Sequence, residues 1–259
     1  MALWCAAFFA LTPALAQDKK SEADKIPPAV NPGRPTVSDP AALTAPGWLE
    51  AEFGLTKGLD RDRTFSTPFL MKLTSKNERL QYRLSFDGYL KPGEGKGGFG
   101  DTYAGLQYLI AKQEKSKFDI AARLTLKLPT APPSIGGTKK VDYSLLLLAS
   151  RDFTPTIHAD FNLALASLSR ADAPGTDTQW QATASFTFPL KGGRWQYTNE
   201  IVYNSPIAGQ QASITTLHGF TYAVHRYDVY DIGVQWQLQG GGANVQVFLG
   251  KTFFLGKLF

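Results

Sequence analysis

From residue 48 onward, apolar and polar side chains alternate along the chain in segments of about ten residues. The alternation is clean in segments 49–55, 80–87, 118–127, 157–164, 180–188 and 230–238. Successive side chains of a β-strand point to opposite faces, so this period of two predicts strands with one apolar and one polar face. In segment 80–87, for example, Leu84 and Phe86 share the apolar face, and Arg83 and Asp87 share the polar face.

Less regular segments of the same kind fill the gaps at 67–74, 102–110, 143–150, 195–204, 213–223 and 245–259. Together they give about twelve strands of about ten residues, the length that a tilted strand needs to cross hydrocarbon. No segment shows a helical period or the length of a transmembrane helix. The pattern therefore predicts an all-β fold, a closed antiparallel transmembrane β-barrel over residues 47–259.

The connections between these segments alternate in length. Compact ones lie near residues 76–77, 153–155, 191–194 and 225–227, and longer ones near 91–100, 129–141 and 167–178. Bacterial outer-membrane barrels have short periplasmic turns and longer outer loops. With an even number of strands, both ends of the barrel are expected on the periplasmic side.

Alternation is also found in soluble β-sandwiches, which therefore stay the alternative fold. A lipid-embedded barrel is favoured by opposite charges on the polar faces and by aromatic residues near strand ends. The aromatic residues are Trp48, Tyr143, Trp180, Phe188, Trp195, Tyr197, Tyr203, Tyr227, Tyr230 and Trp236. The final strand closes on Phe259, which resembles the signature read by the barrel assembly machinery. An open sheet edge in hydrocarbon would cost several kcal/mol per unpaired backbone group, so closure is required.

The first residues form an apolar run that ends in small side chains at Ala14 and Ala16. We interpret residues 1–16 as a signal peptide cleaved before Gln17, although a basic start is missing and the true start codon stays open. A membrane anchor is the alternative, but the run is too short to span a bilayer. Cys5 is the single cysteine, so the mature chain would contain none.

Residues 17–46 form a Pro-rich lead-in, and its prolines prevent a regular helix or strand. We interpret it as a periplasmic, mostly flexible tail in solvent. A plug or a partner-binding arm is the functional alternative.

The chain has 259 residues, with 27 Lys and Arg against 22 Asp and Glu, for a net charge of +5. Hydrophobic residues make up 43% and charged residues 19%, which is too apolar for a disordered chain. The basic residues are scattered among acidic ones, so no nucleic-acid partner is predicted.

Strand parity predicts which charged residues line the bore. They are Glu50, Glu52, Arg83, Asp87, Asp119, Arg123, Lys127, Asp160 and Glu200. A register slip of one residue would exchange the two faces of any strand. The three histidines are dispersed, and no G-x-S-x-G elbow or H-x-x-x-H spacing occurs, so we predict no catalytic residue, no metal and no cofactor.

Residues 31–40 (NPGRPTVSDP) and 47–55 (GWLEAEFGL) resemble a known family. Segments 97–102 (GGFGDT), 127–130 (KLPT) and 231–234 (DIGV) are similar to turns and a late strand of the same family. It is the meta-pathway of phenol degradation family of outer-membrane barrel transporters. Its members often continue with Gly after KLPT, whereas Ala131 stands here, in an outer loop. The resemblance implies an outer-membrane barrel that passes small, aromatic or hydrophobic molecules.

These observations predict a passive, porin-like channel in the bacterial outer membrane, with membrane lipid, the assembly machinery and a small solute as partners. A structural or ligand-binding barrel without conductance is the alternative. An outer-membrane hydrolase comes third.

Overall fold

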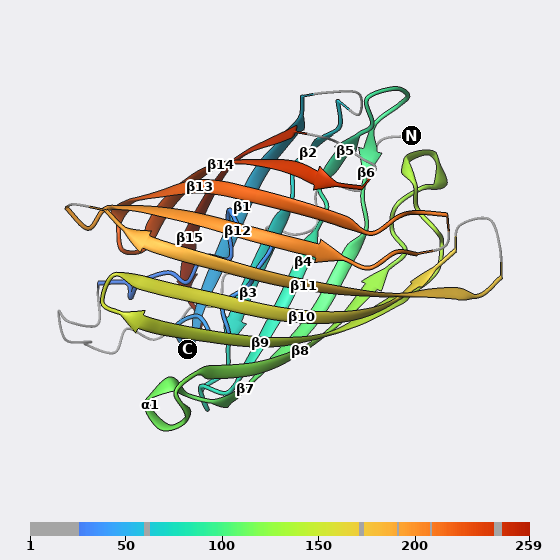
Figure 1. The fold of residues 1–259 in the computed structure, drawn as a ribbon. Helices are drawn as coiled ribbons and strands as arrows, with labels where there is room; N and C mark the ends of the chain where they lie inside the picture. The colour runs from blue at the N-terminus through green and yellow to red at the C-terminus, as the bar shows by residue number, and fades with distance from the viewer. Residues whose placement is uncertain (1–25, 60–62, 171–173, 191, 208, 241–244) are drawn as a thin grey trace.

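The chain folds into one antiparallel sheet whose last strand pairs with its first, which closes a barrel (Figure 1). The structure is a computed structural model, and it describes residues 26–59, 63–170, 174–190, 192–207, 209–240 and 245–259. The expected signal peptide and its cleavage site lie outside these residues.

Within the described residues, twelve strands form the wall, as the alternation predicts. They are β1 (Trp48–Gly58), β3 (Phe69–Thr74), β4 (Leu80–Phe86), β7 (Thr102–Ala111), β8 (Asp119–Leu128), β9 (Asp142–Thr154), β10 (Ile157–Ser169), β11 (Thr176–Pro189), β12 (Trp195–Asn204), β13 (Ser213–His225), β14 (Asp228–Gln239) and β15 (Val245–Lys257). Pairing of β1 with β15 runs from Trp48 opposite Lys257 to Gly58 opposite Gln246. The short strands β2 (Phe65–Ser66), β5 (Tyr89–Lys91) and β6 (Gly98–Phe99) extend the sheet beside β1.

The two ends of the barrel differ in their connections. At one end, which we call the short-turn end, compact turns follow β3, β9, β11 and β13, and α1 (Gln113–Ser116) joins β7 to β8. At the opposite long-loop end, residues 87–101 and 129–141 carry β5, β6 and the 3-10 turn η2 (Pro133–Ile135). The connection expected at 167–178 is shorter than the sequence predicted, because β10 continues to Ser169 and β11 already begins at Thr176.

The C-terminus lies at the short-turn end, where the Leu258 N–H donates to the Gly47 carbonyl at 2.7 Å (Figure 1). None of the helices in the described ranges is long and apolar enough to cross a membrane.

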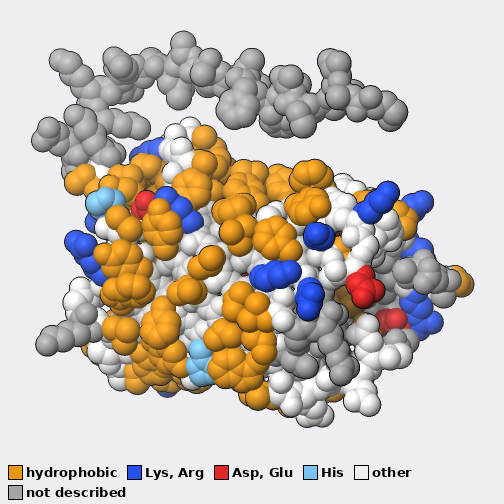
Figure 2. All heavy atoms as spheres, turned by 90° about the horizontal axis from the view of Figure 1, so that it is seen from above, with side chains coloured by type: hydrophobic (Ala, Val, Ile, Leu, Met, Phe, Trp, Pro, Cys, Tyr) orange, Lys and Arg blue, Asp and Glu red, His pale blue; other side chains and the backbone are white. Residues whose placement is uncertain are grey.

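The outer face of the wall is apolar. Leu145, Leu147, Leu163 and Leu165 are each about half exposed, at 48 to 54%, and Figure 2 shows hydrophobic side chains spread over one side of the barrel. Such a surface suits contact with lipid tails, whereas soluble monomers rarely expose a large contiguous apolar patch.

Aromatic pairs lie on this face toward both ends, as expected for residues at the lipid headgroups. Trp195 packs on Tyr222 at the short-turn end, with ring centroids 4.7 Å apart. Trp180 packs on Tyr203 toward the long-loop end, with centroids 4.6 Å apart.

Candidate functional site

Residues 26–46, which we call the lumen segment, enter the barrel at the short-turn end, where Ile26 is exposed, and run through its interior (Figure 1, dark blue). At the short-turn end the Val30 N–H donates to the Arg226 carbonyl at 2.9 Å. Deeper in the lumen, the Ser38 and Thr183 hydroxyl groups are hydrogen-bonded at 2.7 Å, with Thr183 on β11. The chain then returns to the start of β1. The solvated tail expected from the sequence is therefore wrong for residues 30–46, which lie in the lumen against the inner face of the wall.

The lumen segment stays inside because the barrel supplies acceptors for its backbone. A Pro-rich segment cannot form a continuous ladder, yet its buried N–H groups still need partners. Polar side chains of the inner face provide them. The bonds run from the N–H groups of Asn31 to Glu50 (2.9 Å), Gly33 to Glu52 (2.9 Å), Val37 and Ser38 to Glu200 (2.7 and 2.6 Å), Asp39 to Asn162 (2.8 Å), Ala41 to Ser150 (2.8 Å) and Thr44 to Gln81 (3.0 Å).

Two inner-face glycines make room for the segment. A Cβ on Gly219 of β13 would lie 2.4 Å from Cγ of Pro35. A Cβ on Gly250 of β15 would lie 2.3 Å from Nε of Arg34. Any larger side chain at these positions would collide with the segment. Glycines at inward-facing strand positions are the signal in the sequence that could have indicated a filled lumen.

Glu50, Glu52 and Lys72 form a group of charges that we call the closed cluster. The Lys72 Nζ lies 2.6 Å from Glu50 Oε1 and 2.5 Å from Glu52 Oε1, and it also donates to the Asn31 carbonyl. All three side chains are at most 3% exposed. Sequence reasoning placed both carboxylates on the inner face but missed Lys72, which lies opposite Glu50 on the less regular strand β3.

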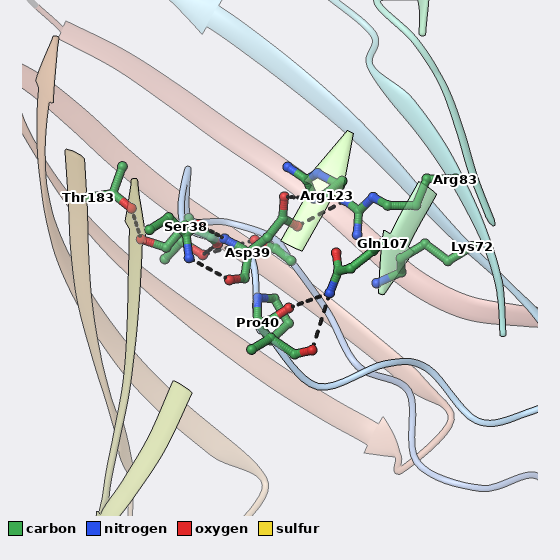
Figure 3. A network of polar contacts seen from close by, with 12 residues as sticks. Ser38, Asp39, Pro40, Lys72, Arg83, Gln107, Arg123 and Thr183 are labelled. Atoms are coloured by element: carbon green, nitrogen blue, oxygen red, sulfur yellow. Dashed lines mark hydrogen bonds and ion pairs between the residues drawn. The ribbon is translucent and has the colours of Figure 1, made fainter. Parts of the chain in front are cut away.

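Asp39, Arg83 and Arg123 form a second group, the open cluster (Figure 3). Asp39 Oδ1 lies 3.0 Å from Arg83 Nη2, and Asp39 Oδ2 lies 2.5 Å from Arg123 Nη1. The side chains are 11 to 15% exposed. Burial raises the pKa of the Asp39 carboxyl, but Arg123 and Arg83 outweigh it and hold the pKa well below its usual range. Sequence reasoning missed Asp39 because it lies in the segment interpreted as a tail.

Three more of the expected residues face the interior with partners of their own. Glu200 of β12 accepts the Ser38 hydroxyl at 2.5 Å as well as the two backbone N–H groups. Asp160 of β10 accepts the Ser150 hydroxyl at 2.5 Å and lies 3.2 Å from His158. Lys127 of β8 pairs with Asp142.

The other two expected residues lie toward the ends of the barrel. Asp87, just after β4, accepts the Tyr103 hydroxyl at 3.1 Å, and its burial raises the pKa of its carboxyl. Asp119, at the start of β8, accepts the Gln113 N–H at 2.8 Å beside α1. The structure therefore brings Glu50 together with Glu52, and Arg83 with Arg123, but it does not gather all nine residues.

The lumen segment lies between two cavities, and its residues Arg34 and Thr36 line both. The first cavity, of about 760 Å³, opens toward the short-turn end beside Pro155 and His158. The second, of about 350 Å³, lies toward the long-loop end beside Asp87 and the open cluster. Water-sized space is thus present on either side of the segment.

The first cavity contains a histidine between two carboxylates. His158 Nδ1 lies 2.7 Å from Asp152, and Nε2 lies 3.2 Å from Asp160. Over the described ranges, no group of three or more His, Cys, Asp or Glu side chains is arranged to hold a metal ion.

The closed wall, its apolar outside and its polar inside define a barrel of the outer-membrane type. No family model matches the chain, and no curated protein does. Among solved structures, an outer membrane channel from Pseudomonas putida F1 is similar, with a TM-score of 0.59 at 14% identity over 87% of this chain and 100% of that one. The NanC porin has a TM-score of 0.57 and the KdgM porin 0.56, each at 10% identity over 79% of this chain and 98% of the other. At these identities, the likeness establishes the fold.

Proposed function

We propose that the protein is a bacterial outer-membrane channel through which small solutes diffuse passively, without a cofactor or energy coupling. The observation that carries this proposal is the pair of cavities on either side of the lumen segment, inside a closed barrel with an apolar outer face. The fold that it shares with porins and an outer membrane channel supports it.

Membrane lipid and the barrel assembly machinery are the proposed partners of the outer face and of the last strand. Leucines of β9 and β10 would face lipid tails, and the aromatic pairs would lie at the headgroups. The strand β15 closes the barrel against β1 beside the terminal Phe259, which suits a strand recognised during insertion.

The nine charged residues predicted from strand parity are the proposed lining of the path. Glu52, Arg83, Asp87 and Arg123 line the second cavity, and Asp160 lines the first. Glu50 and Glu200 would act indirectly, because they hold the lumen segment. Lys127 and Asp119 would contribute charge nearer the two ends.

A second candidate function is a barrel that does not conduct. The lumen segment favours it, because Ser38, Ala41 and Thr44 are at most 2% exposed and leave little free space around them. A hydrolase stays third. Hydrolysis of a lipid or ester panel by the purified protein would support that role.

The phenol-degradation resemblance implies small, aromatic or hydrophobic solutes. We include this solute class in the proposal. The second cavity offers apolar contacts for such a solute at Leu70 and at the ring of Tyr103.

Planar-bilayer recording of the refolded chain separates the first two functions. A channel gives discrete current steps, and the double variant Arg83→Glu, Arg123→Glu is expected to shift the reversal potential toward cation preference. An absence of current would establish the non-conducting alternative. Current with unchanged ion selectivity in the double variant would show that these arginines do not line the path.

A further inference from the structure

The open cluster contains more positive charge than its own carboxylate balances. A guanidinium has five N–H donors, and Asp39 takes one from each arginine. Across the described part of the chain, Asp39 is the only ion-pair partner of Arg83 and of Arg123. Two cations therefore share one anion. By contrast, Arg34 nearby has a carboxylate of its own, Asp231, at 3.3 Å.

This excess charge lies on the wall of the second cavity. Arg83 and Arg123 line it together, and Ser85 and Thr125 add hydroxyl groups. The carboxylates of Glu52 and Asp87 also line it, but Glu52 is paired with Lys72, and Asp87 accepts the Tyr103 hydroxyl. Leu70, Val37 and the ring of Tyr103 supply an apolar wall. A pocket of about 350 Å³ with two guanidinium groups and an apolar wall suits a small anion with an apolar body.

The geometry of Asp39 shows how the two arginines hold a carboxylate, with one oxygen on each guanidinium. Its backbone is fixed separately, because Asn162 accepts from the Asp39 N–H at 2.8 Å and donates to the Asp39 carbonyl at 3.0 Å. The position of the lumen segment at Asp39 therefore does not depend on the Asp39 side chain alone.

Resting on the proposed channel function, we propose that Arg83 and Arg123 form a binding site for small carboxylates with an apolar body, and that Asp39 is its internal competitor. A solute carboxylate takes the place of the Asp39 carboxylate on the guanidinium groups. Aromatic carboxylates are the class that fits both the charge and the apolar wall.

The site is tested by calorimetric titration of the full-length chain, refolded in detergent, with benzoate and with the uncharged benzamide. Wild type is expected to bind benzoate but not benzamide. Arg83→Gln and Arg123→Gln each weaken benzoate binding roughly tenfold, because a charge-assisted hydrogen bond is lost. Asp39→Asn tightens it roughly tenfold, because the competing charge is gone while the backbone bonds to Asn162 remain.

Arg170→Gln is the matched control, since it removes an exposed guanidinium at the long-loop end. Its benzoate affinity should equal that of wild type. Three results would each overturn the site. They are weaker benzoate binding by Asp39→Asn than by wild type, benzamide binding as tight as benzoate binding, and a loss of benzoate affinity in Arg170→Gln as large as in Arg83→Gln.

Bilayer recording of the same preparations tests the channel proposal independently of the binding site. Silent bilayers together with the expected binding pattern would overturn the channel and leave the carboxylate site. Current without that binding pattern would overturn the site and leave the channel. Folding of each variant is checked by the shifted mobility of unheated protein in gel electrophoresis.

Discussion

The closed and open clusters hold the same lumen segment with opposite arrangements of charge. In the closed cluster one cation, Lys72, lies between two carboxylates, and every member is at most 3% exposed. In the open cluster two cations share Asp39 beside a cavity. Residues of the same chemical types in one lumen are thus placed for different purposes, and burial distinguishes them, because the side chains of the open cluster are 11 to 15% exposed.

The difference follows from the environment of each charge. Removing one member of a fully buried group leaves a charge without solvent and without a partner, which costs several kcal/mol. A charge next to a water-sized space can be screened, so its loss costs much less. We therefore expect the closed cluster to control folding and the open cluster to control which ions pass.

Lys72→Met is expected to have the largest effect on stability. Glu50 and Glu52 would then face each other without a counter-charge, and the Asn31 carbonyl would lose its donor. We expect a loss of about 3–5 kcal/mol in the free energy of unfolding. The measurement is urea unfolding of the barrel in detergent, followed by tryptophan fluorescence.

Lys112→Met serves as the control for this change. Its ammonium is half exposed and pairs with Glu78 at the short-turn end, so its removal should cost less than about 1 kcal/mol. Equal losses in the two variants would contradict a special role for burial in the closed cluster.

Glu200→Gln is expected to have an intermediate effect, because it disturbs one of several anchors of the lumen segment, at Val37 and Ser38. The carboxylate accepts the N–H groups of Val37 and Ser38 with different oxygens. Glutamine has only one side-chain oxygen, so its NH₂ group, which cannot accept, would lie against one of these N–H donors. We expect a loss of about 2 kcal/mol in the free energy of unfolding.

The same variant should conduct more than wild type, because the segment loosens at mid-barrel. Single-channel recording checks this expectation, with Glu114→Gln on the exposed turn α1 as the control. Conductance equal to that of wild type would indicate that the segment does not limit the path.

The wall could be predicted from the sequence because each strand has a lipid face and a lumen face. Phe161 and Leu163 alternate with Asp160 and Asn162, and that period of two alone places the latter pair inside. The charged residues could be assigned to the inner face for the same reason. Strand ends were less predictable, since β10 and β11 continue to Ser169 and from Thr176, beyond the residues that alternate cleanly.

The lumen segment could not be predicted in this way. Its prolines exclude regular structure, and its contacts with Glu200 and Asn162 span more than a hundred residues of sequence. Local pattern carries no information about such pairs. Lys72, which pairs with Glu50 and Glu52, was missed because apolar and polar residues do not alternate regularly along strand β3.

Arg83→Gln should have the smallest effect on stability and a clear effect on ion preference. Asp39 keeps Arg123 as its partner, and the vacated position faces the second cavity. Because Asp39 stays paired, we expect a loss of about 1 kcal/mol in the free energy of unfolding. In a salt gradient, the reversal potential should move toward cation preference, because one of the two arginines of the open cluster, which line the second cavity, is gone. A stability loss as large as that of Lys72→Met, with unchanged reversal potential, would show that both clusters are structural and would remove the distinction between them.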